Sequence, residues 1–200
     1  NAPVRGYWVA AVDAKNALAE KTLVYHRFPP GTTFKPSAKV KESWKHVHDP
    51  TALLYVRVAD LNSAGKLRPD RKVEPLILRA NAGDCIHVAL SNRIKSVLDK
   101  PGYSTLPNLK SGFNLNDLRI PTEVGLHAQL VRKHLAESDG LNVGLNNAGA
   151  AQTVPQASTR IYRWYAGLLE TDAMGAPKFV PAEFGTVNLM PADPLKQGQK

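Results

Sequence analysis

The fold is decided by one stretch, Glu74-Pro-Leu-Ile-Leu-Arg-Ala-Asn-Ala-Gly-Asp-Cys-Ile-His-Val-Ala-Leu-Ser-Asn92. It predicts two β-strands joined by a tight corner at residues 81–84. Gly83 accepts backbone angles that other residues avoid, and Asp84 can accept hydrogen bonds from nearby N–H groups. Alternate side chains of the second strand point to opposite faces, Ile86, Val88 and Leu90 to one and Cys85, His87, Ala89 and Ser91 to the other.

Six other stretches have the composition of strands, and turn-rich connections separate them. The first is a short apolar run that predicts a buried strand. In the fifth, Ile161, Arg163 and Tyr165 lie opposite Tyr162 and Trp164, and aromatic residues on such a strand belong to a core. We predict a single domain over residues 1–200, all-β, with an irregular connection at 167–181. The six stretches are Tyr7–Val12, Thr22–Arg27, Leu53–Val58, Val124–Val131, Thr159–Ala166 and Phe184–Met190.

Composition limits the classes of function. The 200 residues are 43% apolar and carry a formal net charge of +9, which raises the question of nucleic-acid binding. The Lys and Arg residues are scattered and form no basic helix, so we expect no nucleic-acid partner but a basic surface, which an acidic neighbouring domain would complement. No apolar run approaches the roughly 18 residues that a membrane span needs. The single cysteine, Cys85, forms no internal disulfide and is expected to be small and buried.

Five segments, in order, resemble one domain of a multicopper oxidase. The resemblance is strongest to the large multi-domain bacterial enzymes that include manganese oxidases, and then to ceruloplasmin-like ferroxidases. It implies a cupredoxin-like Greek-key β-sandwich with long loops, copper as the cofactor, and other cupredoxin domains or subunits as partners. It also implies a secreted or periplasmic location. The five segments are His48–Pro50, Pro75–Arg93, Gly125–Val131, Ser138–Gly140 with Asn142–Gly144, and Tyr162–Ala166.

The copper ligands of the family are only partly present. The family uses His-x-His pairs, which place two imidazoles on the same face of a strand. His127 matches the first histidine of one pair, but Gln129 stands at the second position, and an amide is a poor copper ligand. The later pair is missing, since residues 183–193 contain no histidine. The type 1 copper motif is absent too, because Cys85 lies far from the loop that carries the family's copper cysteine, and neither Met174 nor Met190 has a Cys or His nearby.

Three histidines are the candidate metal ligands. His127 is either a copper ligand that another domain completes or a hydrogen-bonded histidine on a strand that faces a neighbour. His46 and His48 form the one true His-x-His pair of the chain and could chelate a metal if extended, although their basic, Pro-containing surroundings favour an exposed loop. Cys85 and His87 share a strand face and could bind a soft metal, but burial in the sandwich is the simpler interpretation.

The predicted function is therefore that of a cupredoxin domain of a multicopper oxidase. Such enzymes oxidise a phenol or a metal ion and reduce dioxygen, and this chain is expected to be catalytically incomplete in isolation. A second hypothesis is a non-catalytic copper-binding or structural cupredoxin domain. A third is a metal-free carbohydrate-binding or adhesive β-sandwich that uses loop aromatics such as Tyr103 and Phe113. The chain ends at Lys200, where the family supplies a further strand, so we expect a fragment of a larger enzyme.

Overall fold

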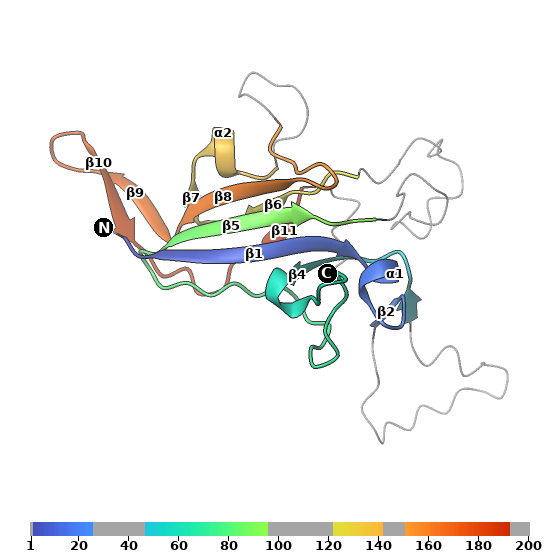
Figure 1. Cartoon of the computed structure of the whole chain (residues 1–200). Coiled ribbons are helices and arrows are strands. Elements are labelled where there is room, and N and C mark those ends of the chain that lie inside the picture. The colour runs from blue at the N-terminus through green and yellow to red at the C-terminus, as the bar shows by residue number, and fades with distance from the viewer. Residues whose placement is uncertain (1, 26–46, 96–121, 142–150, 193–200) are drawn as a thin grey trace, which may run out of the picture.

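The computed structural model describes residues 2–25, 47–95, 122–141 and 151–192. Its largest element is a five-stranded sheet with the strand order β4-β1-β5-β8-β7 (Figure 1). β1 and β5 run parallel, and the other neighbours are antiparallel. The strands of this sheet are β1 (Val4–Asp13), β4 (Leu53–Arg57), β5 (Cys85–Asn92), β7 (Arg132–Lys133) and β8 (Thr159–Tyr165).

Three two-stranded pairs and three short helical segments complete the described part of the chain. β2 (Leu23–Tyr25) pairs with β3 (Val47–Asp49), β6 (Leu126–Ala128) with β11 (Leu189–Pro191), and β9 (Gly167–Thr171) with β10 (Pro177–Pro181). The architecture is all-β, as predicted, because the helical segments span only three or four residues each. These segments are α1 (Ala14–Ala17), the 3-10 helix η2 (Val58–Asp60) and α2 (Leu135–Ser138). No helix in the described ranges is long and apolar enough to cross a membrane.

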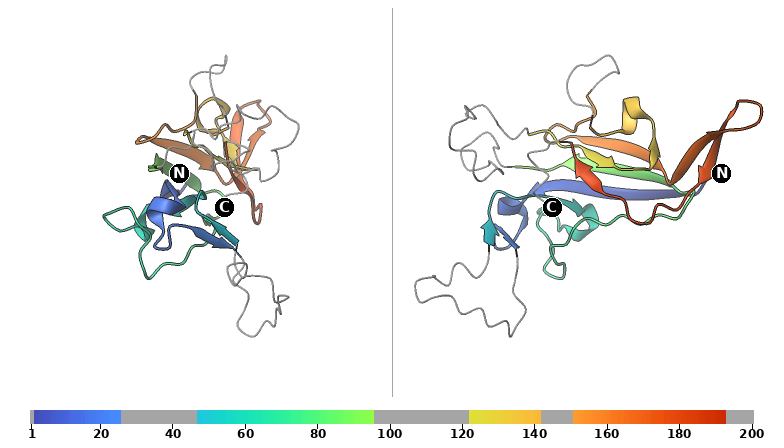
Figure 2. Two further views of the ribbon diagram at one scale, coloured as in Figure 1. Left: turned by 90° about the vertical axis from the view of Figure 1, so that its right-hand side faces the viewer. Right: turned by 180° about the vertical axis from the view of Figure 1, so that it is seen from behind.

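The larger core lies between the five-stranded sheet and the β6–β11 pair. That pair lies behind the sheet in Figure 1 and in front of it in the right-hand view of Figure 2, so the two form separate layers. We call the side of the sheet that faces this pair the inner face. The alternation predicted for β5 and β8 is confirmed, since the inner-face side chains are buried: Ile86, Val88, Leu90, Tyr162 and Trp164.

The opposite side of the sheet, the outer face, is covered only in part. A smaller core packs α1 and the region of η2 against the last residues of β1 and against β4. Farther along the same face, Trp8 is 67% exposed and Ile161 46% exposed. The expectation of a buried strand at 7–12 is therefore right for Val9–Val12 and wrong for Trp8, because none of the described elements covers the outer face at that point. Cys85 and His87, also on this face, are half-buried, so the burial expected for them is only partial.

The predicted corner at 81–84 is confirmed. Gly83 has a positive φ of 86°. The Asp84 carboxylate accepts a hydrogen bond from the Asn81 N–H at 2.7 Å and another from the Arg5 guanidinium. The Arg5 bond, and after it the Asn81 bond, hold the pKa of Asp84 below its ordinary value. The corner thereby connects β5 to the start of β1.

Other predicted strands differ in extent. The strand expected before the corner, over 74–79, is absent: this part of the chain is extended, and Arg57 and Tyr7 donate side-chain hydrogen bonds to the carbonyls of Ile77 and Arg79. A backbone carbonyl that accepts a hydrogen bond from a side chain does not need a partner strand to supply one. The strands expected over 22–27, 124–131 and 184–190 are shorter, as β2, β6 and β11. Residues 26 and 27 lie outside the described ranges.

The irregular connection expected over 167–181 is wrong, because β9 and β10 form a β-hairpin there. The hairpin projects from the body of the molecule (Figure 1). Residues within the turn stabilise it: the Asp172 carboxylate accepts hydrogen bonds from the N–H groups of Met174 and Ala176, and Gly175 has a positive φ of 83°. An Asp followed by a Gly between two apolar pairs was the signal for this hairpin.

Candidate functional site

The candidate site lies on the β6–β11 pair, where His127 stands directly opposite Met190. The turn after α2 packs closely on β6 and brings Asp139 beside the histidine. Gly140 allows this approach, since it has a positive φ of 76° and a Cβ there would lie 2.2 Å from the carbonyl oxygen of Leu126. Gly125 makes the reciprocal contact, because its Cβ would lie 2.3 Å from the carbonyl oxygen of Gly140. Two glycines therefore bring Asp139 and His127 together.

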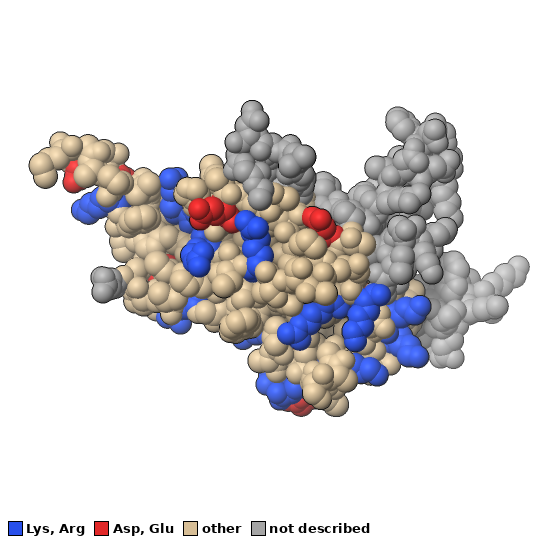
Figure 3. Space-filling model, turned by 45° about the horizontal axis from the view of Figure 1, so that its top comes forward, with Lys and Arg blue, Asp and Glu red and all other residues tan. Residues whose placement is uncertain are grey.

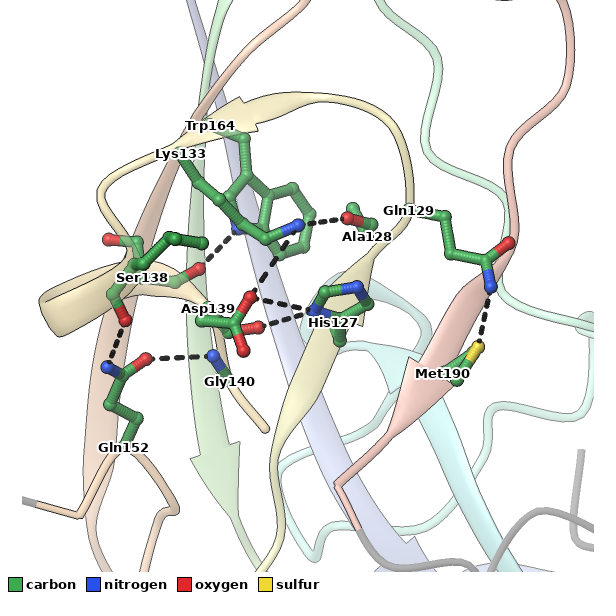
Figure 4. A network of polar contacts seen from close by, with 11 residues as sticks. His127, Ala128, Gln129, Lys133, Ser138, Asp139, Gly140, Gln152, Trp164 and Met190 are labelled. Carbon is green, nitrogen blue, oxygen red and sulfur yellow. Dashed lines mark hydrogen bonds and ion pairs between the residues drawn. The ribbon is translucent and has the colours of Figure 1, made fainter. Parts of the chain in front are cut away.

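Asp139 determines which nitrogen of His127 carries the proton (Figure 4). His127 Nδ1 lies 2.8 Å from the Asp139 carbonyl oxygen and 3.2 Å from its carboxylate Oδ1. Both partners are acceptors, so Nδ1 must be the donor. The neutral imidazole then has its lone pair on Nε2, and no described residue donates a hydrogen bond to that atom. Carboxylates and carbonyls orient metal-binding histidines in the same way, by accepting the N–H of the ring nitrogen that does not bind the metal.

Lys133 neutralises the carboxylate of Asp139. Its side chain is only 7% exposed, and Nζ lies 3.8 Å from Asp139 Oδ1. The ammonium also donates a 2.6 Å hydrogen bond to the carbonyl of Ala128. Burial lowers the pKa of Lys133, and the nearby carboxylate of Asp139 opposes that shift. The site thus contains one paired cation and one paired anion beside His127.

Gln129, the residue that follows β6, contacts Met190 of β11. The Gln129 side-chain amide donates a 3.1 Å hydrogen bond to the Met190 sulfur (Figure 4). Gln129 stands where a His-x-His pair would have its second histidine. Its side-chain amide is hydrogen-bonded to the Met190 thioether. The expectation that Met190 has no His nearby is wrong: the antiparallel register of β6 and β11 places the two side by side, although they are far apart in the sequence.

Buried hydrogen bonds hold the turn that carries Asp139. Trp164 Nε1 donates to the Ser138 carbonyl at 2.9 Å, and the Ser138 hydroxyl accepts from the Arg163 N–H at 3.1 Å. The fully buried Gln152 accepts from the Gly140 N–H at 2.9 Å and donates to the Leu135 carbonyl. Sequence reasoning matched Ser138–Gly140 to the family but did not assign Asp139, Lys133 or Gln152 to a site. The Asp139-Gly140 pair within that segment was the available signal.

None of the other sequence candidates that the structure describes joins this site. His46, Tyr103 and Phe113 lie outside the described residues. His48 is exposed on β3, opposite Val24 of β2, so it occupies a short strand and not the expected loop, and it belongs to a different strand pair from His127. Within the described ranges, no group of three or more His, Cys, Asp or Glu residues could hold a metal ion.

A shallow groove of about 340 Å³ lies beside the site but does not include it. It runs between β7 and the base of the β9–β10 hairpin. Leu130, Leu135 and Leu168 contribute exposed apolar surface. Lys133 also lines the groove and connects it to Asp139 of the candidate site. Neither His127 nor Met190 lines the groove, so the candidate site is defined by hydrogen bonds and strand pairing.

Comparison with known proteins assigns no family: no protein-family model matches the chain, and no curated protein matches its sequence.

Proposed function

We propose that this chain is a cupredoxin-like domain of a multicopper oxidase that does not itself contain a full set of copper ligands. The observation that carries the proposal is the state of His127, whose Nδ1–H is bound by Asp139 while Nε2 has no donor among the described residues. A histidine anchored in this way presents one lone pair in a defined direction, which is what a metal ligand requires.

The placement of the family-like segments supports the proposal. Pro75–Arg93 contains the corner and β5, Gly125–Val131 contains β6, and Tyr162–Ala166 forms most of β8. Ser138–Gly140 forms the turn that binds His127, and the indole of Trp164 holds that turn through the Ser138 carbonyl. Two β-layers around a shared core are also compatible with a cupredoxin-like Greek-key sandwich. His127 of β6, the Ser138–Gly140 turn and the indole of Trp164, which belong to three of these segments, therefore come together at the candidate site.

The donor set fits a partial copper site. Imidazole nitrogen suits copper, and Asp139 orients the ring. Copper, when bound, would supply the one-electron chemistry by which this family oxidises a phenol or a metal ion. The position that would hold a second imidazole is Gln129, whose amide is bonded to Met190. We propose that the remaining ligands come from other cupredoxin domains or subunits, and that the complete enzyme is secreted or periplasmic, as the resemblance implies.

Copper loading of the purified chain tests the proposal. Copper is measured by mass spectrometry and electron paramagnetic resonance in the wild type, His127→Ala and the control His48→Ala. We expect at most about one copper per chain, lost in His127→Ala and kept in His48→Ala. We also expect no sustained oxygen consumption with a phenol or Fe²⁺ as the reductant. Sustained oxidation by the isolated chain would show a complete site and contradict the proposal, as would copper that His127→Ala retains.

The non-catalytic alternative uses the same histidine. A copper-binding or structural cupredoxin domain would also retain copper through His127 but would gain no oxidase activity when companion domains are added. Activity in the reconstituted assembly, lost in His127→Ala, therefore separates the two functions. No described residue specifically favours the metal-free carbohydrate-binding alternative, whose candidate aromatics lie outside the described ranges.

A further inference from the structure

We infer that the groove between β7 and β9 is the contact surface of a homodimer, in which exposed leucines and the edge of β9 from two copies pack against each other. The groove is lined by residues 130–133, 135 and 167–170. None of these residues is a proposed copper ligand, so the inference goes beyond the proposed function and does not depend on it.

The apolar part of the groove consists largely of exposed leucine side chains. Leu130 is 69% exposed and Leu135 is 67% exposed, and Leu168 and Leu169 of β9 are exposed as well. They come from three segments, the turn before β7, α2 and β9. Exposed apolar residues that occur singly are ordinary. Four leucines that line one groove form a patch of the kind that marks an interaction site.

The backbone at Leu130 is strained and holds an apolar side chain in solvent. Leu130 has a positive φ of 64°, which is uncommon for a residue other than Gly, Asn or Asp. The Val131 N–H donates to the Gln129 carbonyl at 2.7 Å, so Leu130 is the central residue of a tight three-residue turn. Strained conformations of this kind collect at functional sites. Contact with a second copy would bury the Leu130 side chain, which the monomer leaves in water.

The groove runs along a strand edge. Four consecutive residues of β9, 167–170, line it, and alternate side chains of a strand point to opposite faces, so such a run meets the groove along the edge of the strand. Within the described ranges, β9 pairs with β10 alone. β10 contains Pro177 and Pro181, which have no backbone N–H to donate, whereas β9 contains no proline. An edge without proline is a template for a strand of another chain.

The charges of the groove favour a second copy as the occupant. Arg132 and Glu170 are exposed, and neither has an ion-pair partner among the described residues, whereas Lys133 is paired with Asp139. Arg132 pairs with Tyr165 at the end of β8, and Glu170 lies toward the far end of β9, so the leucines of β9 lie between the two charges. A two-fold axis there would bring Arg132 of each copy to Glu170 of the other, as an isologous interface requires.

Other occupants fit these charges less well. A strongly acidic partner would be repelled by Glu170, and a strongly basic one by Arg132. Figure 3 shows acidic and basic side chains together on the β9–β10 hairpin, at the left of the view, while the lower right of the described surface carries mostly Lys and Arg. Two copies that met through that basic area would repel each other. The net charge of +9 opposes self-association in general, so we expect a weak dimer.

Sedimentation equilibrium of the full chain measures the dimer directly. We expect the average mass to rise with protein concentration from 21.8 kDa toward twice that value. Arg132→Glu and Glu170→Arg should each weaken dimerisation at least tenfold, because each places like charges opposite one another, and the double variant should return to within threefold of the wild type. Arg163→Glu is the matched control. It replaces an exposed arginine outside the groove, changes the net charge as much as Arg132→Glu does, and should stay within twofold of the wild type.

Leu130→Asn separates the contact from the stability of the fold. Asn adopts a positive φ more readily than Leu, so the urea midpoint of the monomer should not fall, while loss of the apolar side chain should weaken dimerisation at least tenfold. A chain that is monomeric at every concentration would overturn the inference, including one whose groove binds an acidic peptide or a lipid vesicle instead. A dimer that keeps its wild-type affinity in Arg132→Glu or in Leu130→Asn would overturn it too, and so would a charge-swapped double variant that stays weak.

Discussion

The two faces of the five-stranded sheet differ in how they treat the same type of residue, tryptophan. Trp164, on the inner face of β8, is 3% exposed and donates a hydrogen bond to the Ser138 carbonyl. Trp8, on the outer face of β1, is 67% exposed. Both are tryptophans on strands of the same sheet, two strands apart. Burial of a large aromatic residue is thus decided by what packs over the strand and not by its hydrophobicity.

The difference also explains where the candidate site lies. The inner face is covered by the β6–β11 pair and by the turn after α2, and these are the elements that carry His127, Met190 and Asp139. The inner-face aromatics are therefore part of the support of the site, because Trp164 holds the turn that carries Asp139. Around Trp8, no element in the described part of the chain forms such a layer on the outer face.

Removal of Trp164 should have the largest effect. Trp164→Ala leaves a cavity in the larger core and an unbonded Ser138 carbonyl, so we expect a loss of about 3–5 kcal/mol in the free energy of unfolding. Urea denaturation followed by circular dichroism measures it. The same variant should loosen the turn that binds His127. A loss under about 1 kcal/mol would mean that the inner face is not the main core and would remove the contrast between the faces.

Tyr162 provides a test of the inner face by pH. Burial of its side chain raises the pKa of Tyr162 to about 12, and its hydroxyl donates to the Gln152 carbonyl at 2.6 Å. The folded state holds the proton more tightly than the unfolded state, whose tyrosine pKa is about 10. The contribution of this pKa difference to the free energy of unfolding is fully present below about pH 10. It is lost as the pH rises through about 12, which lowers the free energy of unfolding by roughly 3 kcal/mol.

The control for this pH dependence is Tyr162→Phe. Urea denaturation between pH 9 and pH 12 should show a steeper loss of stability in the wild type than in the variant, because other titrating groups contribute equally to both. Parallel curves would show that the Tyr162 hydroxyl is accessible to water, and the inner face would then be less dry than the structure indicates.

Removal of Trp8 should have the smallest effect. Trp8→Ala changes a side chain that is mostly in water already, so we expect a change within about 0.5 kcal/mol in the free energy of unfolding. The measurement is the same urea denaturation as for Trp164→Ala. A loss comparable with that of Trp164→Ala would show that the outer face is covered in solution, and the two faces would no longer differ.

Much of the sheet could be predicted from residue patterns. The faces of β5 and β8, the corner at 81–84 and the all-β class follow from period-two alternation and from the local chemistry of Gly83 and Asp84, and the structure confirms them. The β9–β10 hairpin was not predicted because its strands show no clear alternation of apolar and polar residues. In the structure, apart from Gly167 and Val180, the residues of both strands are exposed. The copper function inferred from the family-like segments stays a proposal.

Some features of the candidate site could likewise be predicted from residue patterns, and others could not. By itself, the sequence determined that His127 lies on a strand, that residue 129 is a glutamine and not a second histidine, and that residues 183–193 offer no imidazole. Only the tertiary structure decided that Met190 stands opposite His127 and that Asp139 binds Nδ1. The physical reason is the separation along the chain over which each interaction acts. Alternation, turn geometry and spacing act between neighbours in the chain, whereas strand register and the close packing of Gly125 against Gly140 depend on how distant segments meet.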